Sequence, residues 1–346
     1  MYANEYDTIN KDLERTRKAV IVFGDSFVEG QGSIDERILS KYPHHIDDGN
    51  VVKFDIDEKE KQQIAKDFPD IQLELLGAQG DMRWELNFVH HERNRNFGAH
   101  LCSEHLNKEW THINFGMRGN GNRASIMNLF LHPFLNLDVA KEFIIIYVPS
   151  GPERFDFSHR ENPTRGSSMG HYYFETMWPT ANTARGSLQE QFEKQTKGKP
   201  TDIEDKAYYR ASLWEAYGHY VYSERMIAQE QILHWQVLNQ WMRSRKIRKF
   251  LWTPAFDNRW SRKHFLRSGL SPSLVDSFPW DKKFNPGGYN SFVNLVEAQE
   301  GLKYNSFYNY MGKGSPEGWI TACAHPSYKG HKRFAKTIYE ELKDVL

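Results

Sequence analysis

The sequence predicts an α/β fold, a three-layer α/β/α sandwich built on a mainly parallel sheet. Short apolar runs alternate with segments of helical periodicity along most of the 346 residues, which is the order of a parallel sheet covered by helices on both faces. The most distinctive polar motifs directly follow apolar runs, at the strand ends where open parallel sheets collect their ligands. We therefore expect one domain over 1–346, with insertions around 155–205 and 254–319.

Each expected element follows from a local pattern. Residues 19–23 are five apolar residues in a row, which fits a strand buried on both faces. Residues 142–148 form the most strand-like segment of the chain, and they end at a Pro-Ser-Gly-Pro turn. The other elements, in chain order, are a helix over 9–17, a helix over 97–110, a strand over 111–115, a helix over 202–243, a strand over 249–253 and a terminal helix over 334–346.

The two expected insertions lack clear periodicity. Residues 155–205 are rich in Gly, Ser, Thr, Asn and charge, with an aromatic cluster between 171 and 179. A loop region of this length is usually functional, so we interpret it as an insertion over the site, in the position of a substrate lid. Residues 254–319 form a second irregular stretch between the last expected strand and the C-terminal motif.

Composition argues against a nucleic-acid partner and against a membrane span. The 45 basic and 45 acidic side chains cancel, so no overall positive field attracts a phosphate backbone. The chain holds no run of about 18 apolar residues, the length a transmembrane helix needs. Aromatic side chains make up 14% of the residues, which we interpret as core packing in preference to a groove for sugars.

The N-terminal segment and the cysteines indicate a reducing compartment. Residues 1–18 contain no apolar run of the kind found in signal peptides. The two cysteines, Cys102 and Cys323, are too few for a disulfide framework. We therefore expect the protein in the cytoplasm or inside a larger particle, and the sequence leaves its oligomeric state open.

The stretch Gly24-Asp25-Ser26 stops the first apolar run abruptly. A serine just past the C-terminal end of a buried parallel strand sits where the loops of the sheet converge on a crevice. Ser26 is therefore the first candidate nucleophile. The alternative is that Asp25 and Ser26 only cap the next helix, because both residue types are common N-caps.

Two other patterns are not assigned a chemical role. The Gly30-Gln31-Gly32 triplet lacks the third glycine and the spacing of a dinucleotide-binding fingerprint. Residues 41–70 hold several His and Asp side chains, but their spacing fits neither a zinc site nor an EF-hand. We interpret this segment as a solvated face and expect neither a metal nor a cofactor.

Two distant motifs place the Gly24-Asp25-Ser26 turn in a larger pattern. The run Asn114 to Gly121, NFGMRGNG, follows an apolar segment midway along the chain, and His325 begins the run HPSYKGH before the terminal helix. These motifs, in this order, resemble the SGNH or GDSL-type hydrolase family. The resemblance implies a flavodoxin-like SGNH fold and hydrolysis of an O-acyl ester, carbohydrate esters included, through an acyl-serine intermediate.

The resemblance also implies a set of site residues. Ser26 would be the nucleophile, His325 its base and Gly119 an oxyanion donor. The turn around Gly119 suits this task, because glycine lets backbone N–H groups point outward to where negative charge develops; the alternative is a plain strand-to-helix turn. We expect the oxyanion hole at Ser26, Gly119 and Ser150, with candidate substrate contacts at Asp25, Asn120 and Arg154.

The sequence departs from the family pattern at two places. The strand over 142–148 lacks the asparagine that follows it in the family, and Ser150 is the nearest residue in register. The triad acid, typically three residues before the histidine, is replaced by Ala322, and Glu317 is the nearest earlier carboxylate. Loss of the acid lowers the rate by orders of magnitude if nothing substitutes for it.

These departures leave two hypotheses. The first is a serine ester hydrolase that acts on a small-molecule or glycan ester. The second is a catalytically impaired protein of the same fold that recognises a glycan or forms part of a particle. The serine, glycine and histidine at these positions favour the enzyme.

Overall fold

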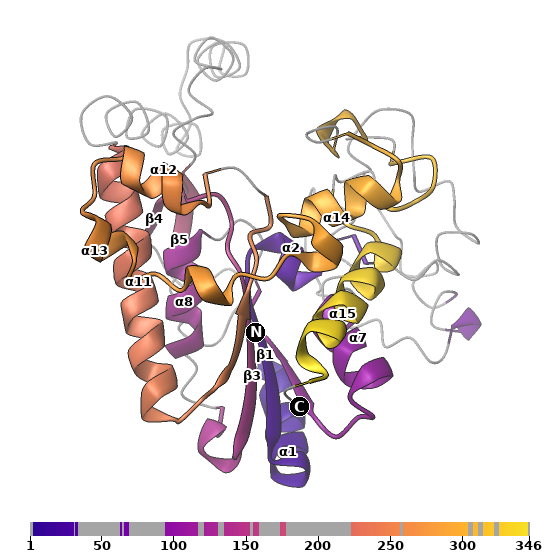
Figure 1. Cartoon of the computed structure of the whole chain (residues 1–346). Helices are drawn as coiled ribbons and strands as arrows, with labels where there is room; N and C mark the ends of the chain where they lie inside the picture. The colour runs from indigo at the N-terminus through magenta and orange to yellow at the C-terminus, as the bar shows by residue number, and fades with distance from the viewer. Residues whose placement is uncertain are drawn as a thin grey trace, which may run out of the picture.

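The fold is built on a four-stranded, all-parallel sheet flanked by helices (Figure 1). The strands are β1 (Lys18–Gly24), β2 (Thr111–Asn114), β3 (Glu142–Val148) and β6 (Lys249–Trp252), in the order β2-β1-β3-β6. This computed structural model describes residues 3–30, 32–33, 63, 66–68, 94–116, 121–130, 135–152, 155–158, 174–177, 223–256, 259–303, 307–310, 314–321 and 325–344.

The strand register sets the edge at which the polar motifs meet. β1 pairs with β2 up to Val22 opposite Asn114, and with β3 up to Gly24 opposite Val148. Because all four strands run the same way, the segments that leave their C-terminal ends meet along one edge of the sheet. The chain after Gly24 therefore lies beside the chain after Val148.

The central strand is buried on both faces, as its apolar run predicts. Ala19, Ile21 and Phe23 face one hydrophobic cluster, while Val20 and Val22 face a second cluster on the other side. All five side chains have no exposed surface. Burying a Val, Ile or Phe side chain stabilises a fold by about 1.5–3 kcal/mol, so β1 supplies much of the apolar contact between the helical layers.

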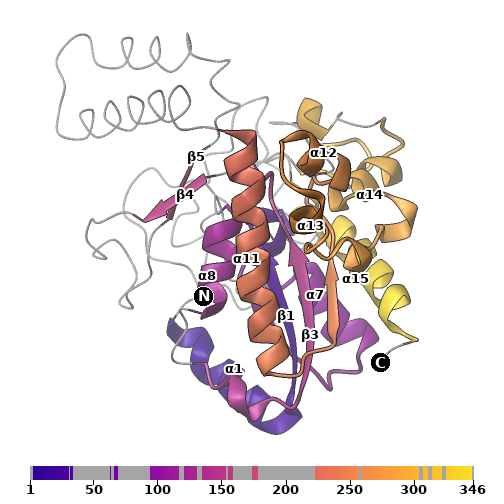
Figure 2. The same cartoon turned by 60° about the vertical axis from the view of Figure 1, so that its left-hand side comes forward.

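Different helices cover the two faces of the sheet (Figures 1 and 2). The cluster on the Ile21 face is completed by α1 (Ala3–Thr16), α8 (Asn122–Phe130), α11 (Glu224–Ser244), α12 (Arg262–Arg267) and α13 (Pro272–Val275). The cluster on the Val22 face is completed by α2 (Ser26–Glu29), α7 (Phe97–His100), α14 (Phe292–Gln299) and α15 (Tyr328–Leu342). Shorter turns are the π-helical η2 (Leu101–His105) and the 3₁₀ segments η3 (Leu137–Val139), η6 (Trp280–Lys282), η7 (Pro286–Gly288) and η8 (Phe307–Tyr310).

The stretch 254–319 is more ordered than its sequence predicts. It contains α12, α13 and α14. At the start of each helix, the side chain of a serine (Ser261, Ser271 or Ser291) accepts a hydrogen bond from the backbone N–H three residues further on. These helices are too short to show helical periodicity, which is why the sequence suggests an irregular segment. The serine caps are the local signal that marks them.

The described parts of 155–205 form a small separate sheet. β4 (Phe155–Ser158) and β5 (Phe174–Met177) pair in antiparallel fashion, and β4 packs near α8. The rest of this predicted insertion lies outside the described residues, so a substrate lid stays a prediction.

The predicted strands agree closely with the observed ones, whereas the bounds of the helices differ. The helix predicted over 97–110 starts as predicted but ends early, as α7 followed by η2, and the other differences are mainly at the helix starts. β3 has the predicted bounds, whereas α15 begins at Tyr328, ahead of the predicted 334. Gly330 hides this early start in the sequence, because glycine is a weak helix former; the fold needs it there, since a side chain would crowd Pro326 and Val296. Of the predicted helix over 202–243, the described part is α11, and residues 202–222 lie outside the description.

Among the helices that the structure describes, none combines the length and the apolar character needed to cross a bilayer.

Candidate functional site

The structure brings Ser26 and His325 together at the C-terminal edge of the sheet. Ser26 Oγ lies 2.7 Å from His325 Nε2, although 299 positions separate the residues in the chain. This distance is typical of a hydrogen bond, so the predicted proximity of the two side chains is confirmed. When Nε2 carries no proton, the serine hydroxyl donates to it, which is the direction that a general base requires.

Ser26 lies on a tight turn between β1 and α2. Gly24 approaches β3 so closely that a side chain on it would collide with the carbonyl oxygen of Val148. Asp25 caps α2, since its Oδ1 accepts a hydrogen bond of 3.0 Å from the Phe27 amide. The capping interpretation is thus true of Asp25, which has no exposed surface, and we leave it out of the candidate substrate contacts. Ser26 itself is the first residue of the helix, with 7% of its surface exposed.

Two buried asparagines tie α2 to the rest of the fold. Asn96 Nδ2 donates to the Val28 carbonyl at 2.6 Å, and Asn114 Nδ2 donates to the Glu29 carbonyl at 3.2 Å. These are two of the carbonyls that the end of a helix leaves without intrahelical partners. Gly116 completes the attachment, because a side chain there would meet the Val28 carbonyl carbon at 2.6 Å. Three residues therefore fix the short helix behind Ser26.

The segment before His325 folds back on itself. Ile320 forms an antiparallel bridge with Pro326, and the Thr321 amide donates to the His325 carbonyl at 2.9 Å. The Thr321 hydroxyl donates to the same carbonyl at 3.0 Å and accepts from the His325 amide at 3.3 Å. Phe27 packs against the imidazole, with ring centroids 4.8 Å apart. The position of the His325 ring is thus set by the hydrogen bonds between Thr321 and the His325 backbone on one side and by Phe27 of α2 on the other.

The second histidine of the C-terminal motif, His331, points into the core. It has no exposed surface, and among the described residues neither ring nitrogen has a hydrogen-bond partner. Its ring stacks against Phe97 and meets Phe292 edge-on. Burial lowers the pKa of His331 well below its usual value, and the neighbouring His100 and His325 lower it further. His331 is therefore neutral and plays no part in proton transfer at Ser26.

The expected oxyanion donors are placed differently from one another. At the start of α2, the Asp25 side chain accepts from the Phe27 amide, and the Asp25 carbonyl accepts from the amides of Val28 and Glu29. The amide of Ser26 takes no part in these capping bonds. By contrast, the amide and the hydroxyl of Ser150 both donate to Asn122 Oδ1, at 2.9 and 3.3 Å. Ser150 is therefore directed toward α8, and the proposal below does not use it.

Four residues that the sequence analysis singled out lie outside the described residues: Gly119, Asn120, Arg154 and Ala322. Their expected roles stay predictions. The nearest described residues on either side are Gly116, which follows β2, and Gly121, which precedes α8.

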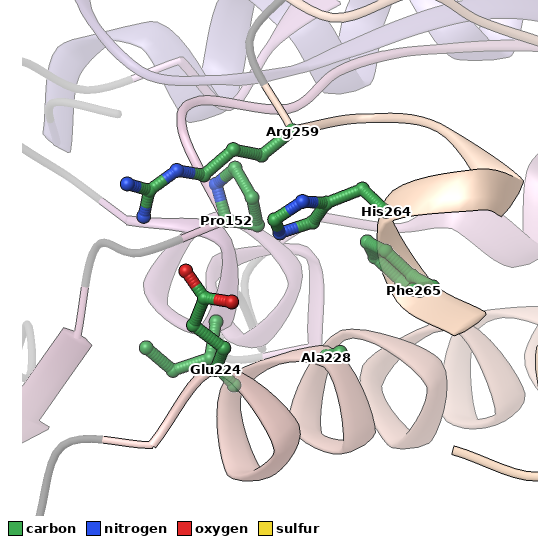
Figure 3. Close-up of a pocket in the computed structure, with 7 residues that line it drawn as sticks. Pro152, Glu224, Ala228, Arg259, His264 and Phe265 are labelled. Carbon is green, nitrogen blue, oxygen red and sulfur yellow. The ribbon is translucent and has the colours of Figure 1, made fainter. Parts of the chain in front are cut away.

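A small hollow lies on the other helical layer, at the same edge of the sheet. Glu224, Arg259 and His264 point toward one another above an apolar floor that includes Phe265 (Figure 3). Its empty space of about 230 Å³ includes open solvent, and only a small part of it is enclosed by the side chains that line it. We do not assign it to the Ser26 site, because α11 and α12 line it while α2 carries the serine.

The residues that the sequence analysis missed are those that hold the pair in place. Asn114 was part of the central motif, and its capping of α2 had no local signal. Asn96 and Thr321 had no local signal either, because each bonds to a residue that is distant in sequence or lies across a turn.

Comparison of the chain with protein-family models, with curated proteins and with solved structures returned no match.

Proposed function

We propose that this chain is a serine ester hydrolase that cleaves an O-acyl ester through an acyl-serine intermediate. The observation that carries the proposal is the 2.7 Å contact between Ser26 Oγ and His325 Nε2. A serine hydroxyl is a poor nucleophile at neutral pH and needs a base within this reach. The resemblance of the three motifs to SGNH hydrolases supports the same reaction, and the proposal includes their flavodoxin-like three-layer fold.

The proposed reaction has two halves. In the first, Ser26 Oγ attacks the ester carbonyl carbon while its proton moves to His325 Nε2; the carbon–oxygen bond to the alcohol then breaks, and the imidazolium returns the proton to that alcohol. In the second, His325 takes a proton from water, whose oxygen attacks the acyl carbon; the bond from that carbon to Ser26 Oγ then breaks, the imidazolium returns the proton to Oγ, and the carboxylic acid leaves. The amides of Ser26 and Gly119 are the proposed donors to the oxyanion of both tetrahedral intermediates.

The alternative function is a binding or structural role in which the site no longer turns over. It is favoured by the alanine at the acid position and by the engagement of both Ser150 donors with Asn122. A glycan or a neighbouring component of a particle would then be the ligand.

Hydrolysis of short p-nitrophenyl esters tests the proposal. We expect turnover by the unaltered protein and its loss in Ser26→Ala and in His325→Gln. Ser327→Ala is the matched control, because Ser327 lies beside His325 but its hydroxyl has no hydrogen-bond partner among the described residues. Equal turnover in all four proteins would exclude Ser26 as the nucleophile.

A substitution that restores the acid separates the two functions. In Ala322→Asp, a carboxylate at the family position should hold the imidazole tautomer and raise turnover by about 10²-fold, since removal of the acid from a complete triad costs about 10⁴. A binding protein would show no ester turnover before or after this change.

A further inference from the structure

The loop that carries His325 depends on a carboxylate from another element. Here the histidine loop denotes the described residues between 314 and 327. It begins after η8 and returns to α15, and its tip, residues 316–318, is exposed. A loop this exposed needs bonds of its own to hold a histidine at 2.7 Å from a serine.

Glu300 supplies these bonds from the end of α14, where it is the C-cap residue. One carboxylate oxygen accepts from the Ser315 hydroxyl at 2.5 Å and from the Trp319 amide at 3.1 Å; the other accepts from the Glu317 amide at 2.6 Å. Hydrogen bonds to an ionised acceptor are roughly twice as strong as neutral ones. A single side chain therefore fixes three positions of the loop.

The bonds continue from Glu300 to the histidine without a break. Ser315 Oγ accepts from the Ile320 amide at 2.9 Å, and the Ser315 amide donates to the Ile320 carbonyl at 2.8 Å. Ile320 pairs with Pro326, and the next residue, Thr321, pairs with His325. The Glu300 carboxylate thus holds the exposed end of the histidine loop, and the other end of the same loop carries the imidazole of His325.

We infer that Glu300 is a positioning residue for His325. It sets the place of the imidazole relative to Ser26 through the histidine loop, and it does not touch the substrate or the reacting atoms. This inference rests on the proposed hydrolase function. Glu317, the nearest earlier carboxylate in sequence, takes part in this network through its backbone: its amide donates to Glu300, and its carbonyl accepts from Lys329.

Glu300→Gln and Glu317→Gln form a matched pair of variants. Glutamine at 300 keeps one acceptor oxygen but replaces the other with an NH₂ group. Both carboxylate oxygens of Glu300 accept hydrogen bonds from the loop, so the NH₂ group would face a donor that it cannot accept from. Glutamine at 317 also removes one negative charge near the histidine loop, but it leaves the backbone bonds of Glu317 intact. Ser315→Ala breaks the connection at the next step and keeps the inference testable if Glu300→Gln does not fold.

The experiment measures kcat and KM for p-nitrophenyl acetate, and the rate at which a fluorophosphonate modifies Ser26. In Glu300→Gln we expect kcat and the modification rate to fall together by up to about 10²-fold, because a misplacement of 1 Å in a catalytic group costs on that order, with KM unchanged. Ser315→Ala should change in the same direction, and Glu317→Gln should match the unaltered protein.

The outcomes separate this inference from the proposed function. A protein that hydrolyses esters, but whose Glu300→Gln and Ser315→Ala variants match Glu317→Gln, would overturn the positioning role alone. A rise in KM with kcat unchanged would also overturn it, since that change indicates lost binding and not a displaced base. An unaltered protein that shows neither turnover nor modification at Ser26 would overturn the hydrolase proposal, and the inference with it.

Discussion

The two halves of the Ser26 site are built in different ways. The nucleophile turn, residues 24–33, grows directly out of the central strand; of its described members, the side chains of 25–29 are all buried. It is held by the close approach of its backbone to Val148 and Gly116 and by hydrogen bonds from the buried side chains of Asn96 and Asn114. The histidine loop is partly exposed and is held by side-chain hydrogen bonds from Glu300 and Thr321. Changes in the turn should therefore act on folding, and changes in the loop should act on the reaction.

The largest effect is expected from Gly116→Ala, on the sheet side of the comparison. The added methyl group would meet the backbone of Val28 and Glu29, at 2.6 Å from the Val28 carbonyl carbon. Backbone cannot move aside as a side chain can, so we expect a loss of about 3 kcal/mol in the free energy of unfolding, the upper end for overpacking. Urea denaturation measures this loss.

Gly98→Ala is the control for that change. A methyl group at Gly98 would have side-chain atoms of His112 and Val22 as its three nearest contacts, at 2.8 Å. These side chains can shift, and alanine is a better helix former than glycine in α7. An equal loss of stability in both variants would show that α2 is not pinned by its backbone.

Gly32 joins the two halves, so Gly32→Ala is the second prediction. Its φ is 91°, and a methyl group there would lie 2.8 Å from Thr321 Oγ1 and 3.0 Å from the Pro326 carbonyl oxygen. Either the turn or the histidine loop must shift to make room, and the shift changes the place of His325 relative to Ser26. We expect a fall in kcat approaching about 10²-fold, larger than the accompanying loss of stability would explain.

The control is Gly288→Ala, which has a φ of 87° and no neighbour within 4 Å of the added methyl group. It introduces the same backbone strain without touching the site. If both variants lose the same stability and neither loses turnover, then Gly32 does not couple the turn to the loop.

These two halves also explain what the sequence could predict. The turn at Ser26 was predictable because a glycine and a serine follow an apolar run closely in sequence, and the C-terminal end of that strand sets the position of the turn. The contact with His325 was predictable only through the order of the motifs. Glu300 and Thr321 could not be predicted, since hydrogen bonds across a tertiary contact leave no periodic pattern. The short helices of 254–319 were missed for lack of length, although their serine caps were visible.

The third prediction concerns the buried aromatic contact in which His331 packs against Phe97 of α7 and Phe292 of α14. Its pKa in the folded protein is far below 6.5, because burial penalises the charged ring. Below pH 6.5 the unfolded chain therefore binds a proton that the folded chain does not, and stability falls as the pH falls. The slope approaches about 1.4 kcal/mol per pH unit for one such group.

His331→Phe should remove one such contribution, since phenylalanine has no proton to bind and suits the aromatic surroundings. The measurement is the free energy of unfolding from pH 7 to pH 5 in both proteins. His234, whose pKa burial and Arg123 lower to about 4, contributes the same sign in this range and remains in the variant. An unchanged pH dependence in His331→Phe would mean that the ring is not neutral and buried as described.

The smallest effect is expected from Thr321→Val, at the inner end of the histidine loop. The change removes the hydroxyl that donates to the His325 carbonyl and accepts from its amide, while the bond from the Thr321 amide to that carbonyl remains. A net hydrogen bond contributes about 1 kcal/mol, which corresponds to a fall in kcat of about fivefold if all of it is expressed in placing the imidazole. Thr321→Ser keeps the hydroxyl and should keep the rate. A loss in Thr321→Val greater than that in Glu300→Gln would reverse the roles of the two ends, because the loop would then be fixed at His325 and not through the carboxylate.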